Sequence, residues 1–392
     1  MVIVQLRSGK EGKILNGYPW VFRDELKSIQ GDTGESGEAN VFSSDYGFLG
    51  RGYYNPYSNR AVMVLTNGDE KLGKELFKKR IIRALEKRER LYLEPFYRLV
   101  HGEGDRLPGL VVDRYGDVLV VQFRNRVVQE FKDVFVDVFK EVLSPTGIFE
   151  RSDFEMGVDD QIERNTGILY GSIPEEMEVL ENGLRFRADV RRGQKTGFFF
   201  DQRESRSFCR SITAKLSLKR GLDLFSFSGA FALNMAISGA EVICVDKSAE
   251  DLELARTNLE MNGLDNRVQL VQNDVFDYLG GFEMKDQFDI VVLDPPSLVK
   301  HRREIPNGIS FFKRLVTGSL PIIRDGGVLG ICTCAYNISI DHLVEVVRRS
   351  TERSGITLSH LAVTLQSADH PWLMQVPESL YLKCLWCFVE KE

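Results

Sequence analysis

The chain has 392 residues, 43% of them hydrophobic, and a formal net charge of −6 at pH 7. A chain of this length can bury substantial cores and divides into two or three domains, and its negative charge argues against a strongly basic nucleic-acid coat while allowing a local basic patch. No apolar run approaches the roughly 20 residues that span a bilayer, and segment 1–7 is too short for the apolar part of a secretory signal, so we expect no membrane partner and a cytoplasmic location.

Short β-like runs alternate with glycine turns from residue 1 to about residue 67. They lie at residues 2–6, 20–22, 37–42, 48–54 and 61–65. This spacing predicts a small β-barrel-like domain over residues 1–68.

A basic helix is predicted next. Residues 71–90 hold nine basic and three acidic side chains, and their apolar positions recur at helical spacing. The basic face includes Lys78, Lys79 and Arg80, which are suited to contacts with RNA phosphates. A merely solvated face would carry the same pattern, so both interpretations stay open.

The middle of the chain predicts a small central α+β domain over residues 69–188. Segment 107–123 predicts a hairpin that turns at residues 115–117, and an amphipathic helix follows near 127–142. A polar stretch near 150–164 shows no clear pattern.

Strand-like and helix-like segments alternate from residue 222 onward. We expect strands near 222–226, 241–246, 268–272, 288–294 and 327–333, and helices from Gly229 and near 249–263, 309–323 and 340–354. This rhythm predicts a doubly wound α/β sheet, in a Rossmann-like domain over residues 189–392.

Residues at the ends of these strands predict a nucleoside-type cofactor site, because ligands of such sheets lie over the carboxyl ends of the strands. Gly229 lets the backbone approach a ligand closely, Asp246 offers an acceptor for a ribose diol, and Asp274 one for an adenine amino group. The turn has one glycine instead of the three of a dinucleotide fold, so a pyrophosphate cradle is not expected.

An Asp-Pro-Pro-Ser segment at 294–297 ends the fourth strand. Prolines lack the amide N–H and fix the backbone, so the Asp294 carboxylate would be held rigidly beside a transferred methyl group. A plain strand-ending turn is the alternative.

Cys332 and Cys334 end the fifth strand, among six cysteines that also include 209, 244, 384 and 387. Cytosine C5 is a poor nucleophile, and a thiolate added at C6 would let it attack a methylsulfonium. Residues two apart point the same way on a strand, so the pattern does not choose between the two cysteines, and core packing is the alternative for both. We expect free thiols throughout and no metal, since the pair 384 and 387 lacks a second ligand pair.

At these residues the chain closely resembles the S-adenosylmethionine-dependent cytosine-C5 methyltransferases of large-subunit (23S) ribosomal RNA that carry an N-terminal PUA domain. The similarity runs over nearly the whole chain, in segments 18–22, 48–56, 107–114, 194–203, 368–371 and 380–383. The resemblance implies S-adenosylmethionine as cofactor, a PUA-like RNA-binding domain before a class I methyltransferase domain, and large-subunit ribosomal RNA as partner. Whether the chain forms a homodimer stays open.

The resemblance also implies residue roles. The cofactor would be held by Asp223, Phe225, Ser226, Ser228, Gly229, Asp246, Lys247, Asn273, Asp274, Gln202, Asp294 and Pro295. Cys334 takes the nucleophile position, Asp294 bonds the base at N3 or N4, and Lys195, Arg203 and Pro296 line the substrate side. Ala335 stands where the family usually has serine and Leu298 where it usually has an aromatic residue, which affects the detail of the pocket.

Two other functions share part of this pattern. Asp-Pro-Pro followed by an aromatic residue marks many enzymes that methylate a guanine or adenine nitrogen, but Ser297 fills the aromatic position here and Cys334 favours cytosine C5. A non-enzymatic ribosome-assembly factor would have a broken cofactor site, whereas Asp223, Gly229 and Asp246 are all present.

Overall fold

The computed structural model describes residues 1–153, 162–191, 193, 196–281 and 287–392. They form two compact units, each built from segments that are distant in the sequence. Unit 1 comprises Met1–Met177, Ala188–Phe200 and Ala368–Ser379, and unit 2 comprises Glu178–Arg187, Asp201–Ser367 and Leu380–Glu392. Within the described part of the chain, no helix has both the length and the apolar character to cross a membrane.

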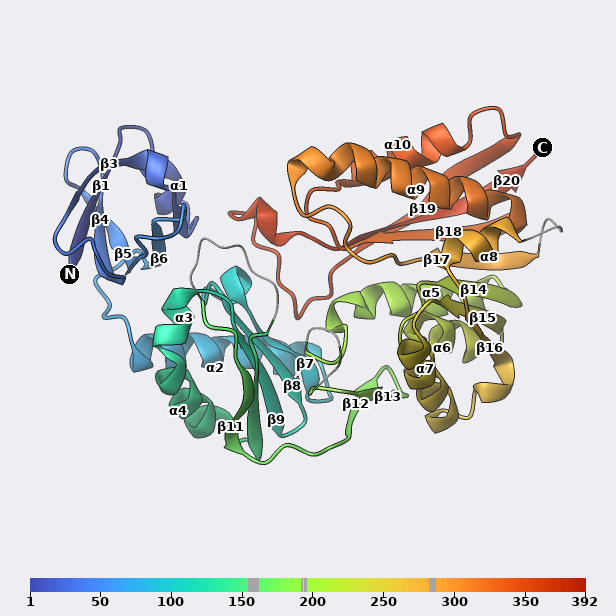
Figure 1. Cartoon of the computed structure of the whole chain (residues 1–392), viewed down its shortest axis with the longest axis horizontal. Coiled ribbons are helices and arrows are strands. Elements are labelled where there is room, and N and C mark those ends of the chain that lie inside the picture. Colours follow the sequence, from blue (N-terminus) through green and yellow to red (C-terminus); the bar gives the residue numbers. More distant parts are fainter. Residues whose placement is uncertain (154–161, 192, 194–195, 282–286) are drawn as a thin grey trace. The chain divides into compact units, whose positions relative to one another are not determined.

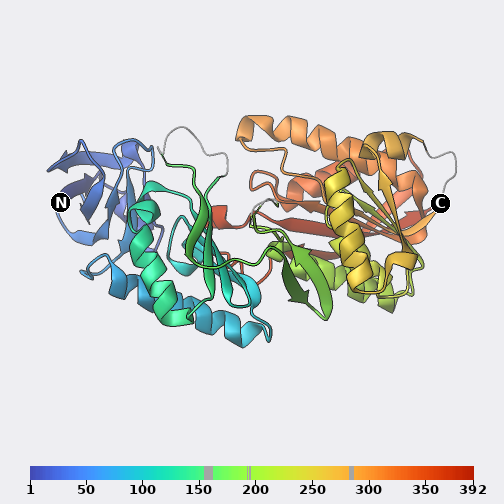
Figure 2. The same cartoon turned by 60° about the horizontal axis from the view of Figure 1, so that its bottom comes forward.

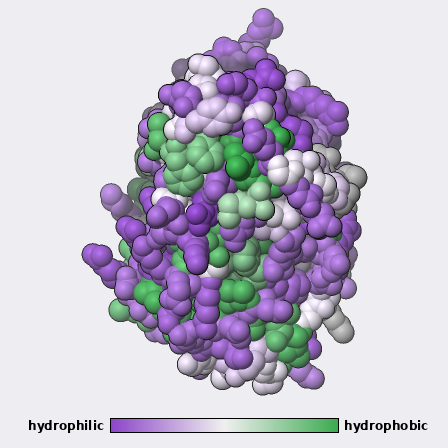
Figure 3. All heavy atoms as spheres, turned by 90° about the vertical axis from the view of Figure 1, so that its left-hand side faces the viewer, coloured by the Kyte–Doolittle hydropathy of each residue, from purple (hydrophilic) through white to green (hydrophobic). Residues whose placement is uncertain are grey.

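A six-stranded sheet in the order β2-β6-β5-β4-β1-β3 begins unit 1 (Figure 1). Its elements are β1 (Val2–Leu6), α1 (Glu11–Leu15), β2 (Trp20–Val21), η1 (Arg23–Glu25), β3 (Leu26–Gln30), β4 (Gly37–Phe42), β5 (Phe48–Tyr54) and β6 (Val62–Thr66). Val4, Val41 and Val62 are buried in its core. The predicted β-rich N-terminal region is thus confirmed. The face of the molecule drawn in Figure 3 is mainly hydrophilic, with scattered hydrophobic residues.

The second part of unit 1 is a five-stranded sheet in the order β11-β10-β9-β8-β7. Its elements are α2 (Lys74–Leu91), β7 (Phe96–His101), η2 (Gly102–Asp105), β8 (Leu110–Tyr115), β9 (Val118–Phe123), α3 (Arg126–Glu130), α4 (Lys132–Leu143), β10 (Gly147–Arg151) and β11 (Thr166–Gly171). Phe77 of α2 stacks on Phe135 of α4 with ring centroids 4.5 Å apart. The predicted hairpin is confirmed, whereas the helix predicted over 127–142 is divided into α3 and α4.

Arg88 departs from the predicted basic face, because it is buried. Its guanidinium makes two hydrogen bonds to the Asp105 carboxylate, at 2.6 and 2.7 Å, and a third to the backbone carbonyl of Asp369 at 2.7 Å. The Asp369 carboxylate in turn accepts the backbone amide of Arg98 at 2.9 Å. These bonds fix segment 368–379 to the rest of unit 1, and they satisfy a charge that would otherwise be costly to bury.

Unit 2 contains a seven-stranded sheet in the order β16-β15-β14-β17-β18-β20-β19. Its strands are β14 (Arg220–Leu224), β15 (Glu241–Asp246), β16 (Val268–Gln272), β17 (Phe288–Leu293), β18 (Ile323–Thr333), β19 (Ile356–Leu365) and β20 (Lys383–Lys391). β14 to β18 pair in parallel, and β20 is antiparallel to both of its neighbours. This confirms the predicted doubly wound sheet.

Helices cover both faces of this sheet (Figures 1 and 2). One layer holds α5 (Arg203–Lys215), α6 (Ala230–Ala236) and α7 (Ala249–Met261), and the other holds α8 (Val275–Gly280), α9 (Ile305–Ser319) and α10 (Ile340–Ser350). The shorter elements are β12 (Met177–Glu181), β13 (Leu184–Ala188), η4 (Phe200–Gln202), η5 (Asp265–Arg267), η6 (Arg302–Glu304), η7 (Leu320–Ile322) and η8 (Pro377–Ser379). Because each crossover passes through a helix, the loops that follow the parallel strands all leave from one edge.

Candidate active site

The register of the sheet brings the ends of five parallel strands to the same level. Leu224 of β14 pairs with Val245 of β15 and with Leu293 of β17. Further out, Asp246 pairs with Gln272 and Leu293 with Ile331. The residues at and after the ends of these strands therefore share one edge, which confirms the predicted convergence of residues 223–229, 246, 273–274, 294 and 332–335.

The turn after β14 has an unusual backbone. Phe225, Phe227 and Gly229 all have positive φ angles, of 63°, 47° and 71°. The backbone amides of Phe225 and Ser226 donate to the carbonyl of Val245, which holds the turn against β15. A Cβ at Gly229 would lie 3.1 Å from the Ala255 Cβ, so the turn also passes close to α7. Left-handed backbone at non-glycine residues costs energy, and this turn holds two such residues within three positions.

Three carboxylates influence one another at this edge. Burial raises the pKa of Asp223 well above its ordinary value, and the charges of Asp294 and Asp246 raise it further. Asp223 Oδ2 accepts the Ala232 amide at 3.0 Å. Its Oδ1 is buried and has no hydrogen-bond partner among the described residues. A positively charged or hydrogen-donating ligand would relieve both the repulsion and the unsatisfied oxygen.

The Asp246 carboxylate holds the loops on each side of it. Oδ2 accepts the backbone amide of Phe227 and Oδ1 that of Ser248, both at 3.0 Å. This carboxylate thus fixes the strained turn, and each of its oxygens retains capacity to accept a further hydrogen bond. Lys247, the next residue, is exposed.

Asn273 and Asp274 follow β16, as predicted. The Asn273 amide donates to the Asp246 carbonyl at 3.0 Å. Asp274 caps α8, because its Oδ1 accepts the amide of Phe276 at 2.8 Å. Sequence reasoning missed this helix-capping role, which the Asp-x-x-Asp spacing before the apolar run could have indicated.

Gln202 links the helical side of the site to the Asp-Pro-Pro segment. Its Nε2 donates to Asp294 Oδ1 at 2.9 Å, which orients the carboxylate. Pro295 is buried and Pro296 is exposed, so the two prolines face different surroundings. Ser226 and Ser228 are buried in the turn after β14.

Arg203, predicted to line the substrate side, is buried against Glu181. Its Nε lies 3.4 Å from Glu181 Oε2, and Arg206 makes a two-bond ion pair with the same carboxylate at 2.7 Å. These contacts give Arg203 a structural role, and its contact with substrate stays a prediction. Lys195 lies outside the described residues, and Lys78, Lys79 and Arg80 belong to unit 1.

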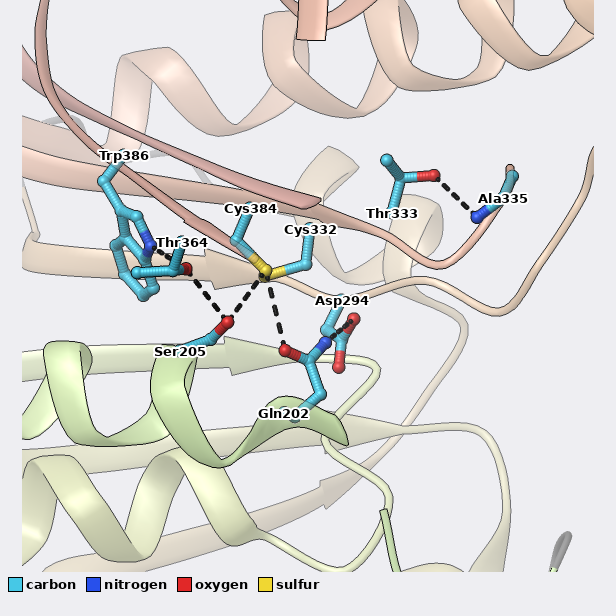
Figure 4. Close-up of a disulfide and its surroundings, with 9 residues drawn as sticks. All are labelled: Gln202, Ser205, Asp294, Cys332, Thr333, Ala335, Thr364, Cys384 and Trp386. Carbon is cyan, nitrogen blue, oxygen red and sulfur yellow. Dashed lines mark hydrogen bonds between the residues drawn. A yellow bond between two sulfur atoms is a disulfide. The ribbon is translucent and has the colours of Figure 1, made fainter. Parts of the chain in front are cut away.

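The prediction that all six cysteines are free thiols is wrong for two of them. Cys332 and Cys384 are direct partners in the antiparallel pair β18 and β20, their Cα atoms lie 4.0 Å apart, and their sulfurs form a disulfide (Figure 4). Gln202 and Ser205 approach this sulfur pair, with Ser205 Oγ 3.3 Å from Cys384 Sγ. This pairing could not be predicted from the sequence, because the two cysteines are 52 residues apart and meet only through the register of β18 with β20.

Cys334 differs from Cys332 because it lies just past the end of β18, which terminates at Thr333. It is half-buried, whereas Cys209, Cys244 and Cys387 are fully buried thiols. Among the described cysteines, Cys334 is therefore the one whose thiol is partly exposed and lies directly beyond a strand of this edge. Cys387 packs in the hydrophobic core of unit 2.

Comparison with known proteins identifies two regions of the chain. Residues 98–364 match the family described as S-adenosylmethionine-dependent methyltransferase, and residues 4–67 match a PUA-like domain. A ribosomal RNA large subunit methyltransferase I from Alteromonas mediterranea is 31% identical over 394 residues, covering 98% of both chains. The Escherichia coli O139:H28 protein of the same name is 30% identical over 393 residues, again covering 98% of both.

Solved structures share the fold. A provisionally named SAM-dependent methyltransferase from Streptococcus mutans aligns with a TM-score of 0.83 and 24% identity, over 99% of this chain and 100% of that one. A second structure with the same score is described as complexed with SAH. At this identity the likeness establishes the fold alone.

Proposed function

The chain belongs to the S-adenosylmethionine-dependent methyltransferase family, and from that premise we propose that it methylates C5 of a cytosine in large-subunit ribosomal RNA through a covalent adduct with Cys334. The observation that carries the proposal is the position of Cys334, a half-buried thiol directly beyond β18 on the same edge as Asp294. Cys332, the alternative nucleophile, has its sulfur in a disulfide.

The residues at the strand edge fit the cofactor. S-adenosylmethionine carries a sulfonium and an ammonium group, and it supplies an electrophilic methyl group when bound. Asp223, with a buried unpartnered Oδ1 and two neighbouring carboxylates, suits a cationic, hydrogen-donating ligand end. Asp246 would hold the ribose and Asn273 with Asp274 the adenine, which follows the order of the strands.

The chain's own residues would then carry the reaction on the base. The Cys334 thiolate adds to C6, which makes C5 nucleophilic enough to take the methyl group. A base then removes the C5 proton, and the bond between C6 and sulfur breaks to release the thiolate. Asp294, oriented by Gln202 at 2.9 Å, would accept a hydrogen bond from the exocyclic amino group of cytosine.

The target base must leave its helix to reach this edge, at a cost of a few kcal/mol unless it lies in a loop. Leu298 and Tyr336, on the loops after β17 and β18, are 42% and 39% exposed and offer apolar surface for a flipped base. Protein-free or partly assembled 23S RNA is therefore the better substrate.

The N-terminal region and α2 would supply the RNA anchoring. Lys79 is the most suitable of the predicted contacts, because its side chain is 74% exposed although it pairs with Glu70 at 3.1 Å. Lys78 pairs with Glu141 at 2.5 Å, and Arg80 donates to the backbone carbonyls of Leu65 and Arg106, which leaves both with structural tasks as well.

The decisive experiment incubates the purified protein with protein-free 23S RNA and labelled S-adenosylmethionine, and identifies the methylated nucleoside by mass spectrometry. We expect 5-methylcytidine from the wild type, none from Cys334→Ala, and wild-type product from Cys209→Ala, which removes a buried thiol elsewhere in unit 2. Label on a guanine or adenine that survives Cys334→Ala would refute the cytosine mechanism and establish nitrogen methylation instead.

A further inference from the structure

Lys383 is a buried lysine at the start of β20, and the function proposed above gives it no task. It pairs with Thr333, the last residue of β18 and the neighbour of Cys334. Its side chain lies in the protein interior, with the residue 4% exposed. Lysine is almost never buried without partners, because desolvation of an ammonium group is costly.

The partners of this ammonium group are carbonyl oxygens of the loop that follows Cys334. Lys383 Nζ donates to the carbonyls of Ile338 at 3.0 Å, Ala335 at 3.3 Å and Tyr336 at 3.5 Å. A fourth contact, at 3.3 Å, goes to the carbonyl of Tyr381 on its own segment. An ammonium group has three N–H donors, so these acceptors satisfy it and favour its charged form.

Two local hydrogen bonds complete the loop. The Ala335 amide donates to Thr333 Oγ1 at 3.3 Å, and the Ile338 amide donates to the Ala335 carbonyl at 3.1 Å. The loop is thus closed on itself and fastened to β20 through one side chain. Loss of Lys383 would remove this donor from the carbonyls of Tyr336 and Ile338 and would leave the Ala335 carbonyl with the Ile338 amide.

Charge adds a second link between Lys383 and Cys334. Burial lowers the pKa of Lys383 to about 8, and the nearby Cys334 opposes this shift. The coupling is reciprocal, so the ammonium charge favours the Cys334 thiolate by the same free energy. Other titratable groups at this end of the sheet include Asp294, which Gln202 contacts, and Asp201, which accepts the Tyr381 hydroxyl at 2.7 Å. Asp223 and Asp246 lie at the same strand edge, where their charges act on one another and on Asp294.

We propose that Lys383 is the positioning residue of Cys334, which fixes the loop that carries the thiol and stabilises its thiolate form. Lys383 contacts the carbonyls of the loop that follows Cys334, so it acts through Cys334. The inference rests on the proposed function only for the identity of the atom that the thiolate attacks.

The test follows the alkylation of Cys334 by iodoacetamide between pH 6 and 10, measured on the Cys334 peptide by mass spectrometry. In the wild type we expect a midpoint below the ordinary thiol pKa of about 8.5. Lys383→Met should raise the midpoint by roughly one pH unit, and Lys383→Arg, which keeps the charge, should restore most of the shift. Lys391→Met is the matched control, because Lys391 lies at the other end of β20 and bonds the Pro321 carbonyl.

Binding of S-adenosylhomocysteine and the thermal midpoint report whether each variant is folded. A wild-type midpoint at or above the ordinary thiol value overturns the proposal whether or not the variants fold. An unchanged midpoint in a folded Lys383→Met protein also overturns it. Alkylation needs no RNA, so a failure of cytosine methylation and a failure of this proposal give separate results.

Discussion

Replacing Gly229 by alanine tests whether the strained turn after β14 serves the cofactor. Gly229 has a φ of 71°, and an added Cβ would lie 3.1 Å from the Ala255 Cβ. A left-handed conformation costs an L-residue about 1–2 kcal/mol. If the turn keeps this conformation in order to bind the cofactor, the cost appears as a loss of about 5- to 30-fold in affinity for S-adenosylhomocysteine.

Calorimetric titration of S-adenosylhomocysteine measures this loss directly. Gly239→Ala is the matched control, because Gly239 also has a positive φ, of 94°, but a Cβ there would meet nothing within 4 Å. It follows α6 at the opposite end of that helix from the strand edge. We expect Gly239→Ala to lower the thermal midpoint without changing the affinity.

Wild-type affinity in a folded Gly229→Ala protein would refute the reasoning. The left-handed turn would then be a consequence of chain connectivity between β14 and α6, and the close approach to α7 would have no role in binding. Equal losses of affinity in both variants would also count against it, since general destabilisation would explain them.

Three further predictions concern stability, charge and RNA. Arg206→Met should lower the free energy of unfolding, measured in urea, by about 3 kcal/mol, because it leaves the buried Glu181 carboxylate without its two-bond partner. Arg348→Met, which breaks an exposed ion pair with Glu345, is the control. A loss for Arg206→Met no larger than that for Arg348→Met would contradict the prediction. Asp223→Asn should raise the thermal midpoint at pH 7 and abolish S-adenosylhomocysteine binding. The pKa of Asp223 is higher in the folded than in the unfolded state, so the carboxyl lowers the free energy of unfolding as the pH rises from the unfolded pKa to the folded pKa. The gain in stability of Asp223→Asn should therefore shrink as the pH falls towards the unfolded pKa. A gain that does not shrink would disprove the assignment. Lys79→Glu should reduce the slope of log affinity for RNA against log salt by about 0.7 to 0.9, as for one lost phosphate contact. An unchanged slope would exclude Lys79 from the RNA-binding surface.

The parallel part of the methyltransferase sheet could be predicted because its strands are short segments rich in apolar residues, and because Asp246, Gln272 and Asp294 mark the ends of three of them. Segments 241–246 and 268–272 match β15 and β16 without error. β19 and β11 escaped prediction, because both are largely exposed edge strands whose residues show weak alternation. The convergence of Asp223, Asp246 and Asp294 at one edge followed from the Rossmann-like rhythm, whereas the order of the strands was not predicted.

Features that depend on long-range pairing could not be predicted. Arg88 looked like one more cation on a basic helix until the structure placed Asp105 and Asp369 around it. Lys383 carries no local signal of burial, since its partners lie 45 to 48 residues earlier in the chain. The choice of Cys334 over Cys332 needed either the family resemblance or the register of β18 with β20.

Unit 1 is built from segments that are far apart in the sequence, and this determines when it can finish folding during synthesis. Its last segment, Ala368–Ser379, is synthesised after almost all of unit 2, and Asp369 follows Arg88 by 281 residues. At typical translation speeds of 5–20 residues per second, roughly 15 to 55 seconds separate the two. During that interval Arg88 has Asp105 but lacks the Asp369 carbonyl, and the Arg98 amide lacks its carboxylate acceptor. Unit 1 therefore reaches its final structure only after segment Ala368–Ser379 has left the ribosome.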